Sequence, residues 1–332
     1  MSNRKIFVLG ANSFSGQDFV DLLLDNPGNS VTGVSRSEER SSLFLKYRLR
    51  DELSSYNYLQ MDMNLDMPRL LEQLDEERPS WIVNYAAQSE VGPSWENPEH
   101  WFQTNTVAFA KLVNHLSRRD YVERFVQISS AEAYGSCTGV VTEDQSDNPS
   151  TPYAASRSAT DMLFAAYHRQ FGFPILTVRP TNVFGARQQL FKIIPRTAIY
   201  LRQNRKIQLH GGGMAVKSFV HIRDVSRGVL SILEAGSIGE KYHLSPSSGI
   251  SVRAAVEMIC NMSNRDFADA VEIVDDRPGQ DARYVIDSTK AFKAFGWRPE
   301  ILMETGIEEV LSWVNDNWQE IAQQSSDYNH KP

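Results

Sequence analysis

An apolar run that ends in a glycine-containing turn and continues as a helix opens the chain. Lys5–Gly10 reads as a buried strand, and Ser15–Asp25 has helical periodicity. The turn between them, from Gly10 to Gly16, has the sequence GANSFSG. Small residues at such a junction let the backbone approach a pyrophosphate, which the N–H groups and dipole of the helix attract. The turn predicts a dinucleotide site; with Ser13 as its middle residue, a plain tight turn is the alternative.

Further apolar runs alternate with helical stretches through the first half of the chain. Near-continuous apolar strands separated by helices indicate a parallel sheet covered on both faces. We therefore expect an α/β fold with a Rossmann-type doubly wound parallel sheet. The predicted strands are Ser30–Ser35, Tyr58–Met61, Trp81–Tyr85, Arg124–Ser129 and Ile175–Arg179, and the predicted helices are Asp66–Glu77, Trp101–Arg119 and Tyr153–Phe171.

After about Pro180 the alternation of apolar runs and helical stretches becomes less regular, which indicates a smaller, interleaved α/β substrate lobe. A strand is predicted at Ser218–Ile222, with helices near residues 223–234, 251–262, 288–295 and 304–319. We expect residues 1–182, with about 217–240, to form the dinucleotide-binding domain. Residues 183–216 and 241–322 are expected to form the substrate lobe, and 323–332 a loose polar tail.

Composition and charge argue against several other classes of protein. The chain of 332 residues has a formal net charge of −7, which argues against a general binder of nucleic acid or membranes. Cys137 and Cys260 lie in no CxxC pair and near no histidine cluster, so no disulfide framework or metal site is indicated. The run Ile6–Leu9 is too short for a signal peptide or a membrane span. A cytoplasmic protein is expected.

The second predicted strand ends in Ser35-Arg36-Ser37. An acidic residue at this position would hold the ribose hydroxyls of NAD. Arg36 cannot accept those hydrogen bonds, but its guanidinium fits a 2′-phosphate. The sequence therefore favours NADP, with NAD possible; a solvated arginine on a charged loop is the alternative.

A candidate acid–base group lies at the start of the predicted helix 153–171. Tyr153 and Arg157 are four residues apart and share a helix face, and positive charge beside a phenol lowers its pKa. Ser130 and Glu132 follow the strand Arg124–Ser129, where parallel-sheet enzymes place active residues. Ser130 could donate to a substrate hydroxyl, and Glu132 could exchange a proton.

Taken together, these motifs resemble the extended short-chain dehydrogenase/reductase superfamily, and within it the nucleotide-sugar epimerases and 4,6-dehydratases. The resemblance covers almost the whole length. It rests on Gly10–Gly16, Asp62, Asn84–Ser89, Ser129–Gly135, Tyr153–Arg157, Arg179–Gly185, Lys217–His221 and Asp276–Asp281. The stretch from Asp276 to Asp287 is similar to dTDP-glucose 4,6-dehydratases, and Ser129–Glu132 to GDP-mannose 4,6-dehydratases and UDP-glucuronate decarboxylases.

The resemblance implies roles for individual residues. Tyr153, with Arg157 beside it, would take the proton of the sugar 4-hydroxyl, Ser130 would steady that hydroxyl, and Glu132 would act at C5 and C6. The implied cofactor residues are Gly10, Asn12, Ser13, Phe14, Ser15, Gly16, Ser35, Arg36, Ser37, Asp62, Met63, Ala86, Ala87, Gln88, Tyr153, Arg157, Pro180 and Val183. The implied residues for the nucleotide-sugar substrate are Ser89, Glu90, Ser130, Asn182, Lys192, Ile193, Lys217, Arg277 and Gln280.

Three positions depart from the family pattern. Arg157 replaces the usual lysine, Ala131 replaces the acidic residue of dTDP-glucose dehydratases, and Glu90 replaces a histidine, where its carboxylate would repel a phosphate. The expected function is a 4,6-dehydratase; a 4-epimerase or decarboxylase, or a non-catalytic dinucleotide-binding protein, are the alternatives. The resemblance also implies a homodimer formed through the predicted helices 101–119 and 153–171.

Overall fold

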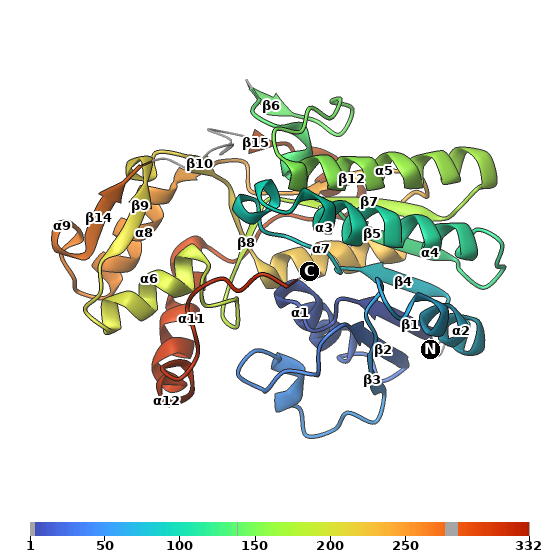
Figure 1. Ribbon diagram of the computed structural model, residues 1–332, viewed down its shortest axis with the longest axis horizontal. Helices are drawn as coiled ribbons and strands as arrows, with labels where there is room; N and C mark the ends of the chain where they lie inside the picture. Colours follow the sequence, from blue (N-terminus) through green and yellow to red (C-terminus); the bar gives the residue numbers. More distant parts are fainter. Residues whose placement is uncertain (1–3, 138, 276–284, 332) are drawn as a thin grey trace.

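Seven parallel strands form the central sheet of the computed structural model, which describes residues 4–137, 139–275 and 285–331 (Figure 1). The strand order is β12-β7-β5-β4-β1-β2-β3, so the direction of winding reverses at β1 and the predicted doubly wound fold is confirmed. The strands are β1 (Arg4–Leu9), β2 (Asn29–Ser35), β3 (Tyr56–Gln60), β4 (Trp81–Asn84), β5 (Arg124–Ile128), β7 (Ile175–Pro180) and β12 (Lys241–Leu244).

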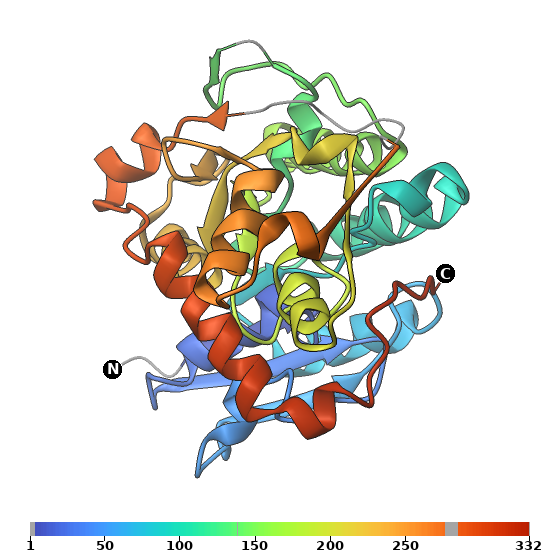
Figure 2. The same cartoon turned by 90° about the vertical axis from the view of Figure 1, so that its left-hand side faces the viewer.

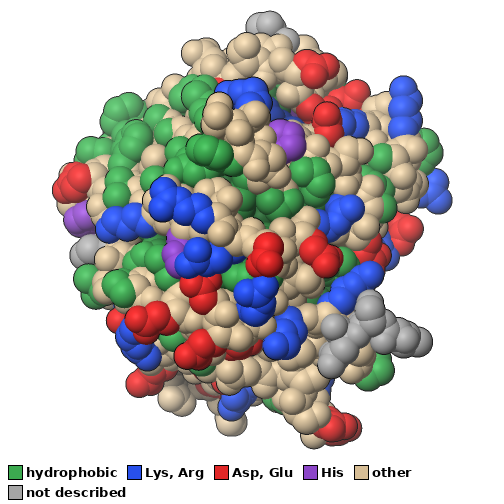
Figure 3. Space-filling view, turned by 90° about the vertical axis from the view of Figure 1, so that its right-hand side faces the viewer, with side chains coloured by type: hydrophobic (Ala, Val, Ile, Leu, Met, Phe, Trp, Pro, Cys, Tyr) green, Lys and Arg blue, Asp and Glu red, His purple; other side chains and the backbone are tan. Residues whose placement is uncertain are grey.

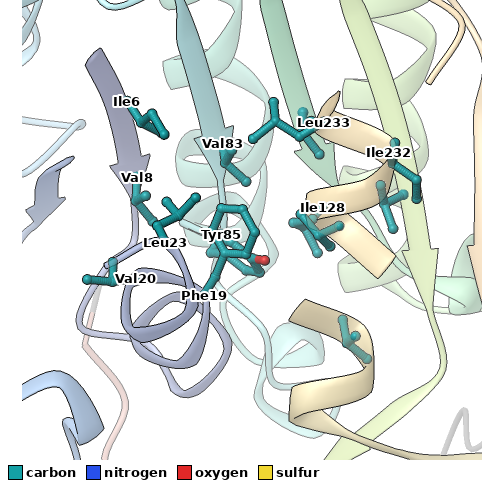
Figure 4. Close-up of a cluster of buried hydrophobic side chains, with 14 of the residues drawn as sticks. Ile6, Val8, Phe19, Val20, Leu23, Val83, Tyr85, Ile128, Ile232 and Leu233 are labelled. Carbon is teal, nitrogen blue, oxygen red and sulfur yellow. The ribbon is translucent and has the colours of Figure 1, made fainter. Parts of the chain in front are cut away.

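Helices cover both faces of this sheet because each strand buries alternate side chains on opposite sides. Ile6 and Val8 pack toward α1 and α7, as Figure 4 shows, whereas Phe7 and Leu9 belong to the core under α2, α4 and α5. The helices on the first face are α1 (Phe14–Leu23), α7 (Ile222–Ala235) and α10 (Thr289–Phe295). Those on the second face are α2 (Met67–Glu77), α3 (Pro98–Phe102), α4 (Ala108–Leu116) and α5 (Pro152–Phe171).

A smaller lobe with its own apolar core lies at the left of Figure 1 and faces the viewer in Figure 2. Its helices are α6 (Ile193–Arg202), α8 (Val252–Met262), α9 (Phe267–Ala270), α11 (Met303–Asp316) and α12 (Trp318–Ile321). Four two-stranded sheets complete the fold: β9 (Ile207–His210) with β14 (Val271–Val274), β8 (Asn182–Phe184) with β11 (Phe219–His221), β10 (Val216–Lys217) with β13 (Ile250–Ser251), and β6 (Val140–Val141) with β15 (Val285–Ile286).

The structure corrects the expected domain boundary at residue 240. Lys241–Leu244 forms β12 and pairs in parallel with β7 at the edge of the large sheet, so it does not belong to the smaller lobe. The helix α10 packs against α7 and β12 and also belongs with the large domain. The chain therefore passes between the two lobes more often than expected.

Two other expectations from the sequence are wrong. The predicted helix 101–119 is interrupted by a π turn at Gln103–Val107, between α3 and α4. The predicted loose tail is packed: Tyr328 lies against Phe191, and His330 stacks on Trp101. Among the residues that the structure describes, no helix has the length and apolar character to cross a membrane.

Candidate active site

Two adjoining pockets lie where the carboxyl ends of the parallel strands meet. The large pocket, of about 850 Å³, extends between the two lobes, and the small pocket, of about 200 Å³, lies over β1, β2 and β4. Candidate residues in the large pocket are Ser13, Phe14, Ser15, Ala87, Ser89, Glu90, Ser130, Glu132, Tyr153, Arg157, Pro180, Asn182, Val183, Lys192, Ile193 and Lys217. Those in the small pocket are Gly10, Asn12, Ser13, Ser35, Arg36, Ser37, Asp62, Met63, Ala86, Ala87 and Gln88.

The glycine turn brings the start of α1 against the ends of β1 and β4. Gly10 has φ +82°, and a Cβ there would lie 2.5 Å from the Ala86 nitrogen. A Cβ on Gly16 would lie 2.2 Å from the Gly10 oxygen, so Gly16 serves the packing of the turn and lines neither pocket. Ser13 has an ordinary φ of −73° and accepts a hydrogen bond from the Gly16 nitrogen at 3.0 Å. It caps the helix, so the turn does not require a glycine there.

Asn12 holds the loop after β2 in place. Its side-chain nitrogen donates to the Glu38 carbonyl at 2.6 Å and to the Tyr58 hydroxyl at 2.9 Å. Its side-chain oxygen accepts from the Arg40 nitrogen at 3.1 Å. These contacts satisfy the amide and fix the position of Asn12 in the wall of the small pocket. Asn12 also lines the small pocket, and its role in binding the cofactor stays a prediction.

Arg36 lies at the mouth of the small pocket, exposed to solvent. Its guanidinium donates to the Lys331 carbonyl at 3.4 Å, and its own carbonyl accepts from Gln60 at 3.3 Å. Asp62 lines the same pocket, and its carboxylate accepts a hydrogen bond from the Asn64 nitrogen at 2.8 Å. The lining of the small pocket thus includes one cationic and one acidic side chain, Arg36 and Asp62.

Tyr153 lies in the first turn of α5, which has Pro152 at its start and Thr151 as its cap. The Thr151 hydroxyl accepts from the Ala154 nitrogen at 3.1 Å and fixes the direction of the helix. The pKa of Tyr153 is raised to about 12; burial is the largest cause, and the charges of Glu132 and Glu90 act in the same direction. Arg157 and a hydrogen bond with Ser130 act in the opposite direction and lower the pKa of the phenol. The four predicted catalytic residues therefore meet in one pocket.

Arg157 is almost fully buried, with 3% of its surface exposed. Its Nη2 donates to the Ile128 carbonyl at the end of β5. Within the described part of the chain, its Nε and Nη1 have no hydrogen-bond partner. Buried donors without partners are costly, and ribose hydroxyls of a dinucleotide would satisfy them. The guanidinium lies beside Tyr153, and its charge lowers the pKa of that phenol.

A buried ionic network fixes the strand ends around the tyrosine. Arg179 of β7 is fully buried and pairs with Asp147 at 2.7 Å and Asp161 at 2.6 Å. Asp161, on α5, also accepts from the Ser129 hydroxyl at 2.6 Å. Because the network joins β5, β7 and α5, it sets the distance between the Ser130 loop and Tyr153. None of these contacts was expected from the sequence.

Ala131 and Glu132 face different surroundings although they are neighbours. Ala131 is 1% exposed and packs in a small core with Tyr134, Val141 and Ile286. Glu132 lines the large pocket. The Ala131 side chain therefore lies in the core and not in the large pocket. Glu132 is the residue of this loop that places a carboxylate in the pocket.

Charged residues from both lobes meet in the outer part of the large pocket. Glu90, after β4, forms an ion pair of 2.6 Å with Lys192 at the start of α6. Arg196, one helical turn after Lys192, also lines the pocket. It was not identified from the sequence, although its spacing from Lys192 indicates that the two side chains share a helix face. Arg277 and Gln280, predicted to bind substrate, lie outside the described residues.

Asn105 is a second residue that the sequence did not reveal. It is fully buried in the π turn, accepts from the Gln88 nitrogen at 2.8 Å and donates to the Gln88 carbonyl at 3.0 Å. It also donates to the Ser156 hydroxyl at 2.9 Å. Asn105 therefore ties the Gln88 segment to α5, and the π turn is the local distortion that brings its side chain there.

This arrangement defines an enzyme class: a doubly wound sheet, a glycine turn at its first helix and a tyrosine with a cationic residue four positions later in one cleft are features of short-chain dehydrogenases/reductases. A family model described as GDP-mannose 4,6 dehydratase matches residues 7–310. The chain belongs to this family, among the nucleotide-sugar 4,6-dehydratases and epimerases, as the sequence predicted.

Individual relatives agree with this assignment over nearly their full length. The low-salt glycan biosynthesis protein Agl12 of Haloferax volcanii is 31% identical over 313 residues, which are 93% of this chain and 97% of that protein. A dTDP-glucose 4,6-dehydratase of Streptomyces niveus is 30% identical, covering 94% and 93%. The crystal structure of the dTDP-glucose 4,6-dehydratase DesIV from Streptomyces venezuelae, with NAD bound, superposes with a TM-score of 0.87 at 27% identity, over 95% of this chain and 98% of that chain.

Proposed function

We propose that this chain converts a nucleoside-diphosphate hexose to the corresponding 4-keto-6-deoxyhexose. The single observation that carries the proposal is the placement of Glu132 in the same pocket as Tyr153 and Ser130. A 4-epimerase needs only the tyrosine and the hydroxyl donor for proton transfer at the 4-hydroxyl. A carboxylate beside them supplies the further base and acid that elimination of water requires.

The residues of the chain divide the proton transfers between them. Tyr153 accepts the proton of the sugar 4-hydroxyl, and Ser130 holds that hydroxyl by a hydrogen bond. Arg157 stabilises the phenolate during this step through its charge. Glu132 removes the proton at C5, which the neighbouring ketone has made acidic, and delivers a proton to the departing C6 hydroxyl. A bound nicotinamide would supply the chemistry of hydride transfer from C4 and back to C6, so the reaction consumes no cofactor. Glu132 takes up a proton from solvent after the water has left and returns it to C5.

Pocket charge supports NADP as the preferred dinucleotide. Arg36 at the rim of the small pocket is suited to a 2′-phosphate. Gly10, Ser13 and the first turn of α1 would hold the pyrophosphate, and Arg157 the ribose next to the nicotinamide. The relative DesIV has NAD bound, so NAD is the second candidate.

The substrate diphosphate fits the outer part of the large pocket. Lys192, Arg196 and Lys217 line it and supply positive charge. Such charges form the strong hydrogen bonds that phosphates prefer. The Glu90 carboxylate is paired with Lys192, which reduces the repulsion that the sequence alone suggested.

A panel of substrates tests the proposal. The purified protein is incubated with UDP-, dTDP-, GDP- and CDP-hexoses, and products are measured by mass spectrometry. Loss of one water from the sugar supports dehydration. An isomer of unchanged mass indicates a 4-epimerase, and loss of carbon dioxide from a uronate indicates a decarboxylase. Binding of a dinucleotide without turnover of any sugar would instead indicate the non-catalytic alternative.

The homodimer and the cytoplasmic location stay predictions of the sequence. Exposed apolar side chains on the face of α3, α4 and α5 support the dimer; Phe102, Val107 and Met162 are 38%, 40% and 59% exposed. Figure 3 shows hydrophobic side chains gathered on the upper part of the face that carries α4 and α5. Sedimentation at several protein concentrations measures the oligomeric state.

A further inference from the structure

The segment from Gln323 to Lys331, here called the strap, runs from the smaller lobe to the dinucleotide end of the large domain. It leaves α12 and crosses to the side of the small pocket, where Figure 1 shows its end in the middle of the molecule. From residue 326 its side chains alternate: Ser326, Tyr328 and His330 are half-buried, while the residues between them are exposed. Such alternation is typical of an extended segment lying on a surface.

Aromatic contacts fix the strap to both lobes. The Tyr328 ring meets Phe191 edge to face, with ring centroids 5.3 Å apart, on the side of the smaller lobe. His330 stacks on Trp101 of α3, with centroids 5.2 Å apart and an angle of 5° between the planes. A hydrogen bond of 2.9 Å joins His330 to His100, and one of 3.1 Å joins it to the Tyr328 hydroxyl. These contacts anchor the strap to the smaller lobe through Tyr328 and to the large domain through His330.

The strap also contacts both pockets. Its Lys331 carbonyl accepts hydrogen bonds from Arg36 and from Gln88, two residues that line the small pocket. Ser326, Asp327 and Tyr328 line the large pocket, in which Tyr153 lies. A dinucleotide that extends from Arg36 past the start of α1 to Tyr153 would therefore pass beneath it.

We propose that the strap is part of the dinucleotide site and retains the cofactor between turnovers. This inference rests on the proposed function, because an enzyme that returns its hydride to the product has no need to exchange the dinucleotide. The sugar can enter between the lobes while the aromatic anchors of the strap stay in place. Tyr328 and His330 are the positioning residues, and neither takes part in proton transfer.

A direct test measures the dissociation of NADP from the full chain, from a variant that ends at Ala322 and from Y328A/H330A. N329A, which changes an exposed strap residue, is the matched control. The release of prebound reduced dinucleotide into an excess of the oxidised form is followed by fluorescence. We expect release to be about tenfold faster in both strap variants, a change of about 1.4 kcal/mol, and unchanged in N329A.

The possible results separate the strap from the proposed function. Release at the rate of the full chain, or tighter binding after removal of the strap, would overturn the inference; tighter binding would mean that the segment competes with the cofactor. If all forms have normal melting temperatures but none of them binds any dinucleotide, the proposed function is excluded as well. Turnover of a sugar by the variants at saturating NADP keeps the proposed function intact whatever the release rates are.

Discussion

Glu90 and Lys192 join the two lobes of the active-site cleft through an ion pair of 2.6 Å. Glu90 belongs to the loop after β4, and Lys192 begins α6 in the smaller lobe. The pair places a carboxylate in the pocket of Tyr153, and its charge raises the pKa of that phenol. Glu90 therefore influences both the entrance to the cleft and the base within it.

Replacement of Glu90 by Gln is expected to move the pH dependence of turnover. The pKa of Tyr153, about 12 with burial as the largest cause, falls when the charge of Glu90 is removed. Since the phenolate is the active form, activity rises with pH through this pKa, and the rising limb should move to lower pH. Rates measured across pH test this. E99Q, at an exposed position on α3, is the control, and an unmoved limb in E90Q would contradict the expectation.

The variant Y153F should lose turnover while keeping its fold. Only the group that accepts the proton is removed, and general acid–base catalysis contributes about 10²–10⁴-fold in rate. Product formation and the melting temperature are measured together. Tyr167 lies on the same helix and forms a weak contact of 3.4 Å with Asn114, so Y167F should behave as the unmodified protein. Activity of Y153F within a few-fold of the unmodified chain would exclude the mechanism.

The variant E132Q should separate oxidation from elimination. Oxidation at C4 depends on Tyr153 and Ser130, whereas removal of the C5 proton depends on the Glu132 carboxylate. We expect reduced cofactor to accumulate during one turnover, which its absorbance reports, while no dehydrated product forms. The exposed E123Q is the comparison. Dehydration at an unchanged rate in E132Q would assign the C5 proton to another group.

Arg36 should discriminate between the two dinucleotides. In R36A we expect NADP affinity to fall about tenfold more than NAD affinity, because a charge-assisted contact to the 2′-phosphate is lost. Calorimetric titrations of both dinucleotides measure the difference. R69A removes a similarly exposed arginine on α2 and controls for net charge. Equal losses for NAD and NADP would show that Arg36 does not contact a 2′-phosphate.

The main sheet and most of its flanking helices could be predicted because their signals are local. Consecutive residues such as Ile6 and Phe7 are both apolar because they pack on opposite faces of the sheet, and this local pattern can be recognised without knowledge of distant partners. β12 was missed because KYHL is short and mixed in polarity, and its place depends on pairing with β7.

Residues of the site were predictable where they belong to compact motifs. Tyr153, Arg157, Ser130 and Glu132 lie in two short stretches, and the structure brings them to one pocket. Asn105 and Arg179 act through partners far along the chain, so no local pattern marks them. The strap was expected to be loose because its composition is polar. The residue that holds it, Trp101, lies far away in the sequence, so no local pattern indicated that His330 stacks on it.

The position of β12 at the edge of the large sheet also affects how the chain folds during synthesis. Its partner β7 ends at Pro180, so the intervening residues must leave the ribosome before Lys241–Leu244 can pair with it. During that interval β7 presents backbone N–H and C=O groups that can pair with another nascent chain. Translation that stops between these two strands would therefore leave a fragment prone to aggregation, with greater need of chaperones than the finished protein.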